Sequence, residues 1–246
     1  MIPAAAGRLA AARVAALVAA LVAALLVAAG TAAQPAPAAT LADGGWQLRA
    51  RGAEPVLELL DAGGRTLQTW DVGTLDGRQP SRVAAIQPSL PRRSFVIALQ
   101  DVAELWEISL DPAAAPIYDG LVHDYRMGEA LARPGYLGVR RTPLPRPLAD
   151  LRIDPTGRVV LAVDAAADAP PGVVVIHLDV RRVIARLALA APPDLDRLVF
   201  VDACARRWLG LPDRPGGPMR WFDAANWTPR AAAGAPQAGC ATQPPG

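Results

Sequence analysis

The chain has 246 residues, of which 52% are hydrophobic, 5% aromatic and 20% charged, enough for one domain of ordinary size or two small ones. Its 25 prolines and 21 glycines are too many for a helical bundle, so turn-rich β structure is the leading class. All 25 basic residues are arginine, and removal of Arg8 and Arg13 with the leader described below leaves 23 to balance 23 acidic residues. A neutral chain has no net attraction for phosphate backbones, so nucleic acid is not an expected partner.

The N-terminus has the pattern of a secretory leader. Two arginines precede an uncharged apolar run over residues 14–29, and small residues lie three and one positions before a cut after Ala33. We therefore expect residues 1–33 to be a signal peptide and the protein to be periplasmic or secreted. The apolar run is near the length that spans a bilayer, so an uncleaved anchor is the alternative, and it is the one membrane contact we expect.

The rest of the chain divides by composition into three parts. We expect residues 34–43 to be a Pro/Ala linker, residues 44–230 to form one folded domain, and residues 231–246 to be a disordered tail rich in Ala, Pro, Gly and Gln. Cys204 and Cys240 are the only cysteines, and an oxidising compartment permits one disulfide between them. Two cysteines so far apart form neither a haem attachment motif nor a zinc cluster.

Short apolar segments, β-branched and bounded by turn residues, fill the predicted domain, and no long helical period interrupts them. The predicted strands cover residues 55–60, 66–72, 82–86, 94–99, 104–110, 117–122, 158–163, 172–178, 182–189 and 195–201.

A unit recurs among these strands: an apolar strand that ends in an acid, a tight turn and a second strand. The acids are Asp61, Asp111, Asp179 and Asp223, at intervals of 50, 68 and 44 residues, and the long interval contains an insertion over residues 123–147. These intervals are typical of propeller blades, so we predict an all-β, β-propeller-like domain of about four blades of antiparallel strands. A β-sandwich is the alternative fold. The acids are expected to bond the backbone of the following turn and to have no catalytic role.

The first half of the domain resembles a known family. Residues 81–86 (SRVAAI), 95–99 (FVIAL), 104–108 (ELWEI) and 121–124 (LVHD) resemble, in order and spacing, the haem d1 propeller domain of cytochrome cd1 nitrite reductase and the related proteins of haem d1 assembly. The similarity is clearest over residues 55–124.

The resemblance implies an eight-bladed propeller that binds haem d1 in its central well, of which this chain would form a half. It also implies that His123 corresponds to one of the distal histidines of the family. The axial histidine and the second distal histidine have no counterpart here, and His177 lies in an apolar strand where a single backbone hydrogen bond is its expected role. A complete nitrite reductase is therefore not expected.

The insertion is the predicted site, because propeller ligands are bound by loops at the channel mouth. We expect Arg126, Arg140 and Arg141 to bind the carboxylates of haem d1 or a related tetrapyrrole, and His123 to bind the cofactor beside its iron. The alternative interpretation makes His123 a solvated or turn-capping residue. No catalytic residue is identified.

Three functions remain open from the sequence. The first is a d1-type propeller that binds a tetrapyrrole or supports its handling. The second is a noncatalytic propeller scaffold for protein–protein interaction in the periplasm, and the third is an exported hydrolase, for which no nucleophile and base are apparent. Because four blades make a small ring, we also expect a homodimer or a partner protein to complete the propeller.

Overall fold

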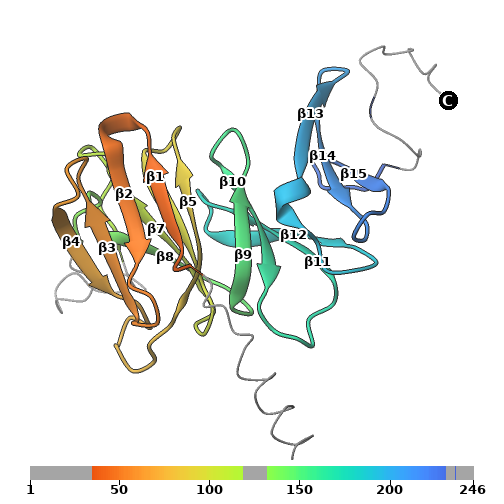
Figure 1. The fold of residues 1–246 in the computed structure, drawn as a ribbon. Helices are drawn as coiled ribbons and strands as arrows, with labels where there is room; N and C mark the ends of the chain where they lie inside the picture. The colour runs from red at the N-terminus through yellow and green to blue at the C-terminus, as the bar shows by residue number, and fades with distance from the viewer. Residues whose placement is uncertain (1–34, 119–131, 231–235, 237–246) are drawn as a thin grey trace, which may run out of the picture. The chain divides into compact units, whose positions relative to one another are not determined.

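The computed structural model describes residues 35–118, 132–230 and 236 (Figure 1). In these residues fifteen β-strands form four antiparallel sheets, accompanied by two short 3-10 helices, η1 (Asp43–Gly45) and η3 (Leu195–Arg197). The predicted all-β class is therefore confirmed. No helix within the described ranges is both long and apolar enough to pass through a lipid bilayer.

In each sheet the strands pair in chain order, which is the meander of a propeller blade. Blade 1 contains β1 (Ala38–Leu41), β2 (Trp46–Ala50), β3 (Val56–Leu60) and β4 (Thr66–Asp71). Blade 2 contains β5 (Val83–Ser89), β6 (Ser94–Leu99), β7 (Glu104–Ser109) and β8 (Val139–Pro143). Blade 3 contains β9 (Leu148–Ile153), β10 (Val159–Asp164), β11 (Gly172–His177) and β12 (Arg182–Ala188). Blade 4 contains β13 (Val199–Ala203), β14 (Arg206–Pro212) and β15 (Met219–Asp223). The prediction of a partial propeller of about four blades is confirmed.

The apolar core lies in layers between successive blades, and one strand serves two layers. On β6, Phe95, Ile97 and Leu99 join the cluster shared with blade 1, whereas Val96 and Ala98 join the cluster shared with blade 3. Successive side chains of a strand point to opposite faces of its sheet. A strand whose sheet is covered by a neighbouring blade on each face therefore needs apolar residues at every position.

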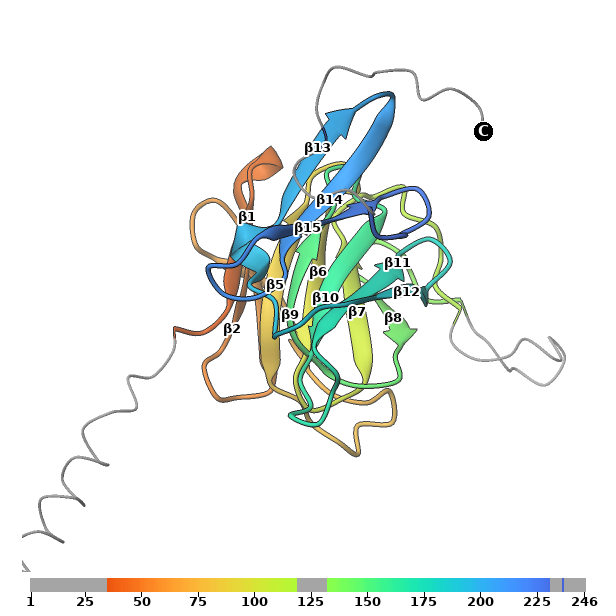
Figure 2. The ribbon, with the colours of Figure 1, turned by 90° about the vertical axis from the view of Figure 1, so that its right-hand side faces the viewer.

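The same division continues along the chain. On β10, Val160 and Ala162 pack toward blade 2, and Val159 and Leu161 pack toward blade 4. The first strands of blades 1, 2 and 3 contact one another in sequence, and β5 and β9 run side by side in Figure 2. Alternate side chains of β6 and β10 therefore pack against the preceding blade and against the following blade.

The repeated acids end the third strand of every blade. Each of Asp61, Asp111 and Asp223 accepts a hydrogen bond from the N–H group two residues later, at 2.9, 3.0 and 2.9 Å. The predicted turn role is confirmed for these three. Asp179 differs, because its carboxylate binds Arg92 of blade 2.

Two predicted boundaries are corrected. The expected linker over residues 34–43 does not hold from Ala38 onward, because β1 pairs with β2 and buries Leu41, which is 1% exposed. The insertion over residues 123–147 is not a loop throughout, because its later part forms β8, which pairs with β7. The first of these strands has four residues, two of them alanine, and the second ends in a proline, so both elements depend on the strands beside them.

Two predicted strands also differ from the structure. Residues 195–201 begin as η3, and β13 starts only at Val199. In the segment expected as a strand over residues 117–122, Ile117 forms a single bridge with Arg133, and the remainder from 119 is outside the described residues. The proposed signal peptide, the tail other than residue 236, His123 and Arg126 are also outside them.

Candidate functional site

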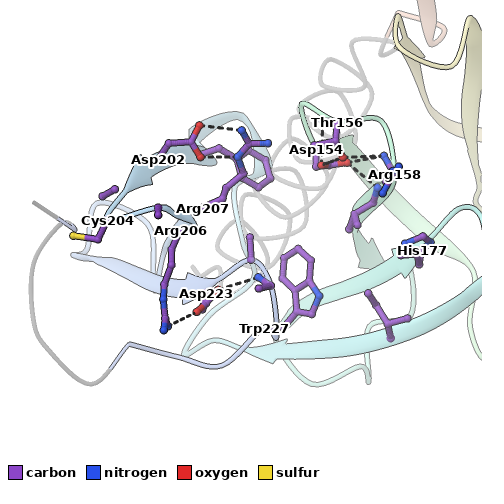
Figure 3. A pocket seen from close by; sticks show the side chains of 17 residues that line it. Asp154, Thr156, Arg158, His177, Asp202, Cys204, Arg206, Arg207, Asp223 and Trp227 are labelled. Atoms are coloured by element: carbon purple, nitrogen blue, oxygen red, sulfur yellow. Dashed lines mark hydrogen bonds and ion pairs between the residues drawn. The ribbon is translucent and has the colours of Figure 1, made fainter. Parts of the chain in front are cut away.

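A cavity of about 770 Å³ lies between blades 3 and 4 (Figure 3). Its walls come from the β9–β10 turn, the end of β11, β12, the β13–β14 turn and the segment that follows β15. The volume is within the range of small-molecule sites in proteins. Blade packing therefore forms a space for a ligand at the edge of the two sheets.

One part of the cavity wall is apolar. It is formed by Val159, Ile184, Phe200 and Trp227, of which Phe200 and Trp227 pack at the margin of the core between blades 3 and 4. Trp227 has a φ of 63°, and its N–H donates to the carbonyl of Asp223 at 2.6 Å. This closed turn after β15 places the indole between Asp223 and His177 in the view of Figure 3.

The carboxylates of the described lining residues already have partners. Asp154 accepts hydrogen bonds from three backbone N–H groups of the β9–β10 turn, at 2.7 to 3.1 Å. Asp202 forms a bidentate pair with Arg207, at 2.8 and 2.9 Å, and hydrogen bonding to that guanidinium lowers the pKa of Asp202. Asp223 pairs with Arg206 at 3.0 Å. Among its described lining residues, the cavity therefore presents no carboxylate without a partner.

Two hydrogen-bond donors remain on the blade 3 side. In the described part of the chain, the Arg158 guanidinium makes no hydrogen bond and no ion pair, although its charge contributes to lowering the pKa of Asp179. The Nδ1 atom of His177 accepts a hydrogen bond from the N–H of Asp179 at 3.2 Å. This bond assigns the proton of the neutral imidazole to Nε2. Arg158 and His177 both line the cavity.

The residues predicted to bind a cofactor are not brought together where they are described. Arg140 and Arg141 are neighbours on β8, so their side chains point to opposite faces of blade 2. Arg141 donates to Glu104 and to the carbonyl of Gly73, each at 2.7 Å, and its guanidinium lies 4.3 Å from the centre of the Trp106 ring.

Arg140 lines a smaller cavity of about 370 Å³ with Arg92 and Glu107. Its guanidinium donates to the carbonyl of Ala115 at 3.2 Å, in an exposed position. Because the hydrogen bond of Arg140 is exposed and Arg141 is held by Glu104 and Trp106, Arg140 is the more accessible of the two. A role for them in cofactor binding remains a prediction.

Neither Arg158 nor Trp227 is a site residue predicted from the sequence, and for His177 the prediction is a structural role only. The expected backbone hydrogen bond of His177 is present, yet the side chain also borders the cavity. The sequence feature that lies at this cavity is the aspartate-led turn before Arg158, in which Asp154 accepts the N–H of Arg158. No group of three or more metal-ligating side chains occurs among the described residues.

Comparisons with known proteins support the d1-type resemblance, although no protein family profile matches the chain. Dihydro-heme d1 dehydrogenase of Pseudomonas aeruginosa is 30% identical over 188 residues, which cover 76% of this chain and 33% of the relative. A solved structure of dihydro-heme d1 dehydrogenase NirN in complex with DHE aligns with a TM-score of 0.58 and 26% identity, over 75% of this chain and 34% of that chain. A streptogramin B lyase structure aligns with a TM-score of 0.46 and 13% identity, over 77% of this chain and 54% of that chain.

The chain resembles the haem d1 propeller proteins, as the sequence predicts. It spans about a third of the length of the dihydro-heme d1 dehydrogenase that it matches, in the comparison of sequences and in that of structures.

Proposed function

We propose that this d1-type propeller protein binds a tetrapyrrole of the haem d1 type, or supports its handling, after export to the periplasm. The observation that carries the proposal is the similarity to dihydro-heme d1 dehydrogenase, which extends over three quarters of the chain in both sequence and fold. A complete nitrite reductase is not proposed, because only His123 matches a histidine of the family site.

In this proposal His123 is the residue beside the iron, and Arg126, Arg140 and Arg141 bind carboxylates of the cofactor. The iron would supply the redox chemistry, and the side chains would bind and orient the ring. Of the two described arginines, Arg140 is ready to bind, since its hydrogen bond to a carbonyl is exposed. Arg141 would first have to leave Glu104, with which it forms a partly buried ion pair.

Export and assembly belong to the same proposal. Residues 1–33 direct the chain out of the cytoplasm, with an uncleaved anchor as the alternative. A second copy, or a partner protein, completes the ring by joining the outward faces of blades 1 and 4. The outward face of blade 1 contains the buried Glu58 with Arg49, whereas that of blade 4 contains Val199 and Trp221. These faces differ in polarity, so a head-to-tail contact between them would be directional.

The test is a spectral titration of the purified mature protein with haem d1 and with ordinary haem. We expect a saturable change in the visible spectrum with haem d1. His123→Ala should mainly move the Soret band and alter the pH dependence of anion binding, because a residue beside the iron tunes its ligands. Arg140→Ala should weaken binding more than His123→Ala. A wild-type protein that shows no saturable change with either cofactor would contradict tetrapyrrole binding.

The second candidate function is a noncatalytic scaffold for a protein partner. It is favoured by the unpaired outward faces of the first and last blades. A scaffold predicts no visible absorption after purification from the native periplasm and no consequence of changing His123, so the same titration separates the two functions.

A further inference from the structure

We propose that the cavity between blades 3 and 4 binds an aromatic carboxylate, with its carboxylate on Arg158 and on Nε2 of His177 and its ring against Trp227 and Phe200. The inference rests on the proposed function only for the source of the ligand, which is either the carboxylate-bearing edge of a tetrapyrrole or a smaller aromatic acid. The chemistry that the cavity recognises is the same for both.

The cavity favours an anion because the polar groups of its described wall that have no partner in the protein are hydrogen-bond donors. The oxygens of Asp154, Asp202 and Asp223 accept hydrogen bonds from backbone or arginine donors. The remaining polar groups, the Arg158 guanidinium and Nε2 of His177, are donors. A ligand that supplies acceptors completes this set, and a carboxylate supplies two oxygens that can receive a charge-assisted hydrogen bond.

The formal charges of the cavity wall balance, so net charge does not by itself attract an anion. Arg206 and Arg207 are neutralised by Asp223 and Asp202, so they add no net charge to the cavity. Asp154 balances Arg158 in number, but its oxygens are turned into the β9–β10 turn and the residue is 8% exposed. The cavity thus recognises an anion through directed donors and not through a broad positive field.

The backbone of Arg158 and the ring of His177 are held in place before a ligand arrives. Arg158 follows Gly157, whose φ of 74° closes the turn, and Asp154 accepts the backbone N–H of Arg158 at 2.9 Å. His177 is oriented by the N–H of Asp179, and that aspartate is itself bound to Arg92 at 2.6 Å. The oriented ring of His177 reduces the ordering cost of binding, whereas the exposed side chain of Arg158 is ordered by the ligand itself.

The apolar wall explains why the ligand carries a ring. Phe200 and Trp227 are half-buried at the margin of the core, and Ile184 is 38% exposed. A planar ring can cover these three side chains while its carboxylate reaches blade 3. A purely polar anion such as phosphate would leave the wall exposed to water.

The test uses 2-naphthoate and its neutral methyl ester as probes of the mature protein, followed by titration calorimetry. We expect one saturable site per chain for 2-naphthoate and an affinity about tenfold lower for the ester, because the ester carries no negative charge to pair with the Arg158 guanidinium. Arg158→Gln should lower the affinity for 2-naphthoate about tenfold and leave that for the ester unchanged. Arg65→Gln, in an exposed turn of blade 1, is the matched control and should bind both probes as the wild type does.

Two variants of His177 separate ligand binding from a structural role. In His177→Asn the amide oxygen can still accept the N–H of Asp179, but the donor at the Nε2 position is lost. In His177→Gln the amide nitrogen lies near the Nε2 position, and the acceptor for Asp179 is lost. We expect weaker 2-naphthoate binding in the first and partial recovery in the second, whereas a purely structural His177 would give the opposite order.

A competition experiment identifies the source of the ligand. Displacement of 2-naphthoate by protoporphyrin IX, but not by its dimethyl ester, supports the cavity as part of a tetrapyrrole site. Binding of 2-naphthoate without displacement supports a separate aromatic acid. Equal affinity for acid and ester, or wild-type affinity in both Arg158→Gln and His177→Asn, would overturn the inference. Failure of haem d1 to bind while 2-naphthoate binds would overturn the proposed function alone.

Discussion

Arg92 and Asp179 join blades 2 and 3, with Nη1 of Arg92 lying 2.6 Å from Oδ1 of Asp179 across 87 positions of sequence. The same guanidinium donates through Nε to Glu107 at 2.7 Å, so one side chain connects the β5–β6 turn, β7 and the end of β11. Burial lowers the pKa of Arg92, but its hydrogen bonds and charge interactions with Glu107 and Asp179 outweigh burial and raise it. Asp179 thereby links two blades, whereas the other three repeated aspartates close their own turns.

We expect Arg92→Met to destabilise the protein by about 2–4 kcal/mol, because it leaves the buried Glu107 carboxylate without its charged partner. Arg92→Lys should recover only part of this loss, since an ammonium cannot reproduce the fork of a guanidinium. Urea unfolding followed by tryptophan fluorescence measures both. Arg65→Met removes an exposed ion pair and should leave the midpoint unchanged, and an equal midpoint for Arg92→Met would refute the bridging role.

Stability should decline as the pH falls below about 4. Hydrogen bonding to Arg92 lowers the pKa of Asp179 from 3.8, and hydrogen bonding to Arg82 lowers that of Asp101. A carboxylate with a lower pKa in the folded state stabilises the fold above its unfolded pKa, and this contribution is lost as the pH falls through the folded pKa. Unfolding at fixed urea between pH 6 and pH 2 tests this. An Asp179→Asn and Asp101→Asn double variant should show a shallower decline, and an unchanged slope would count against these two groups.

Gly210→Ala should destabilise blade 4 by about 1–3 kcal/mol through overpacking. A Cβ atom at this position would lie 2.7 Å from the ring of Trp221, which faces Gly210 across the β14–β15 pair. The added Trp221→Leu substitution removes the contact with the ring and leaves a Val199 methyl group at 3.0 Å, so the alanine should cost less in that background than in the wild type. A double-mutant cycle in urea measures the coupling, and strictly additive effects would argue against the contact.

The N-terminal pattern predicts a mature protein that begins at Gln34, because small residues precede the expected cleavage after Ala33. Intact mass of the protein recovered from the periplasm measures the N-terminus. Ala33→Arg places a large charged side chain directly before the expected cut and should block cleavage, because that position requires a small residue. Recovery of the wild type only as full-length protein in the membrane fraction would favour the anchor.

Light scattering of the mature protein should give the mass of a dimer, or of a complex with a partner. The reason is that a four-blade arc leaves two outward blade faces without a neighbouring blade. Val199→Glu places a charge on the outward face of blade 4, where Val199 is 41% exposed, and should shift the dimer toward monomer. Leu90→Glu, in the β5–β6 turn where Leu90 is 56% exposed, is the control. A stable monomer for the wild type would contradict assembly into a ring.

The strand-rich class, the repeat and the turns could be predicted from the amino-acid sequence alone, because these features are local. Apolar runs such as that of β6 carry their own signal, and Asp61 bonds groups only two and four residues away. The strand order inside each blade follows from the repeat, since each unit pairs its strands in chain order. The d1-type resemblance was equally accessible, because it depends on short runs at fixed spacing.

The elements and contacts that depend on distant partners became visible only in the folded chain. Leu41 is buried because β1 lies beside β2 and β5, and β8 is a strand because β7 offers it an edge. The cavity joins Arg158 and Trp227, which come from different blades, so no local pattern could bring them together. Alternation along β8 places Arg140 and Arg141 on opposite faces of the blade. Tertiary packing then holds Arg141 against Trp106 and leaves Arg140 accessible.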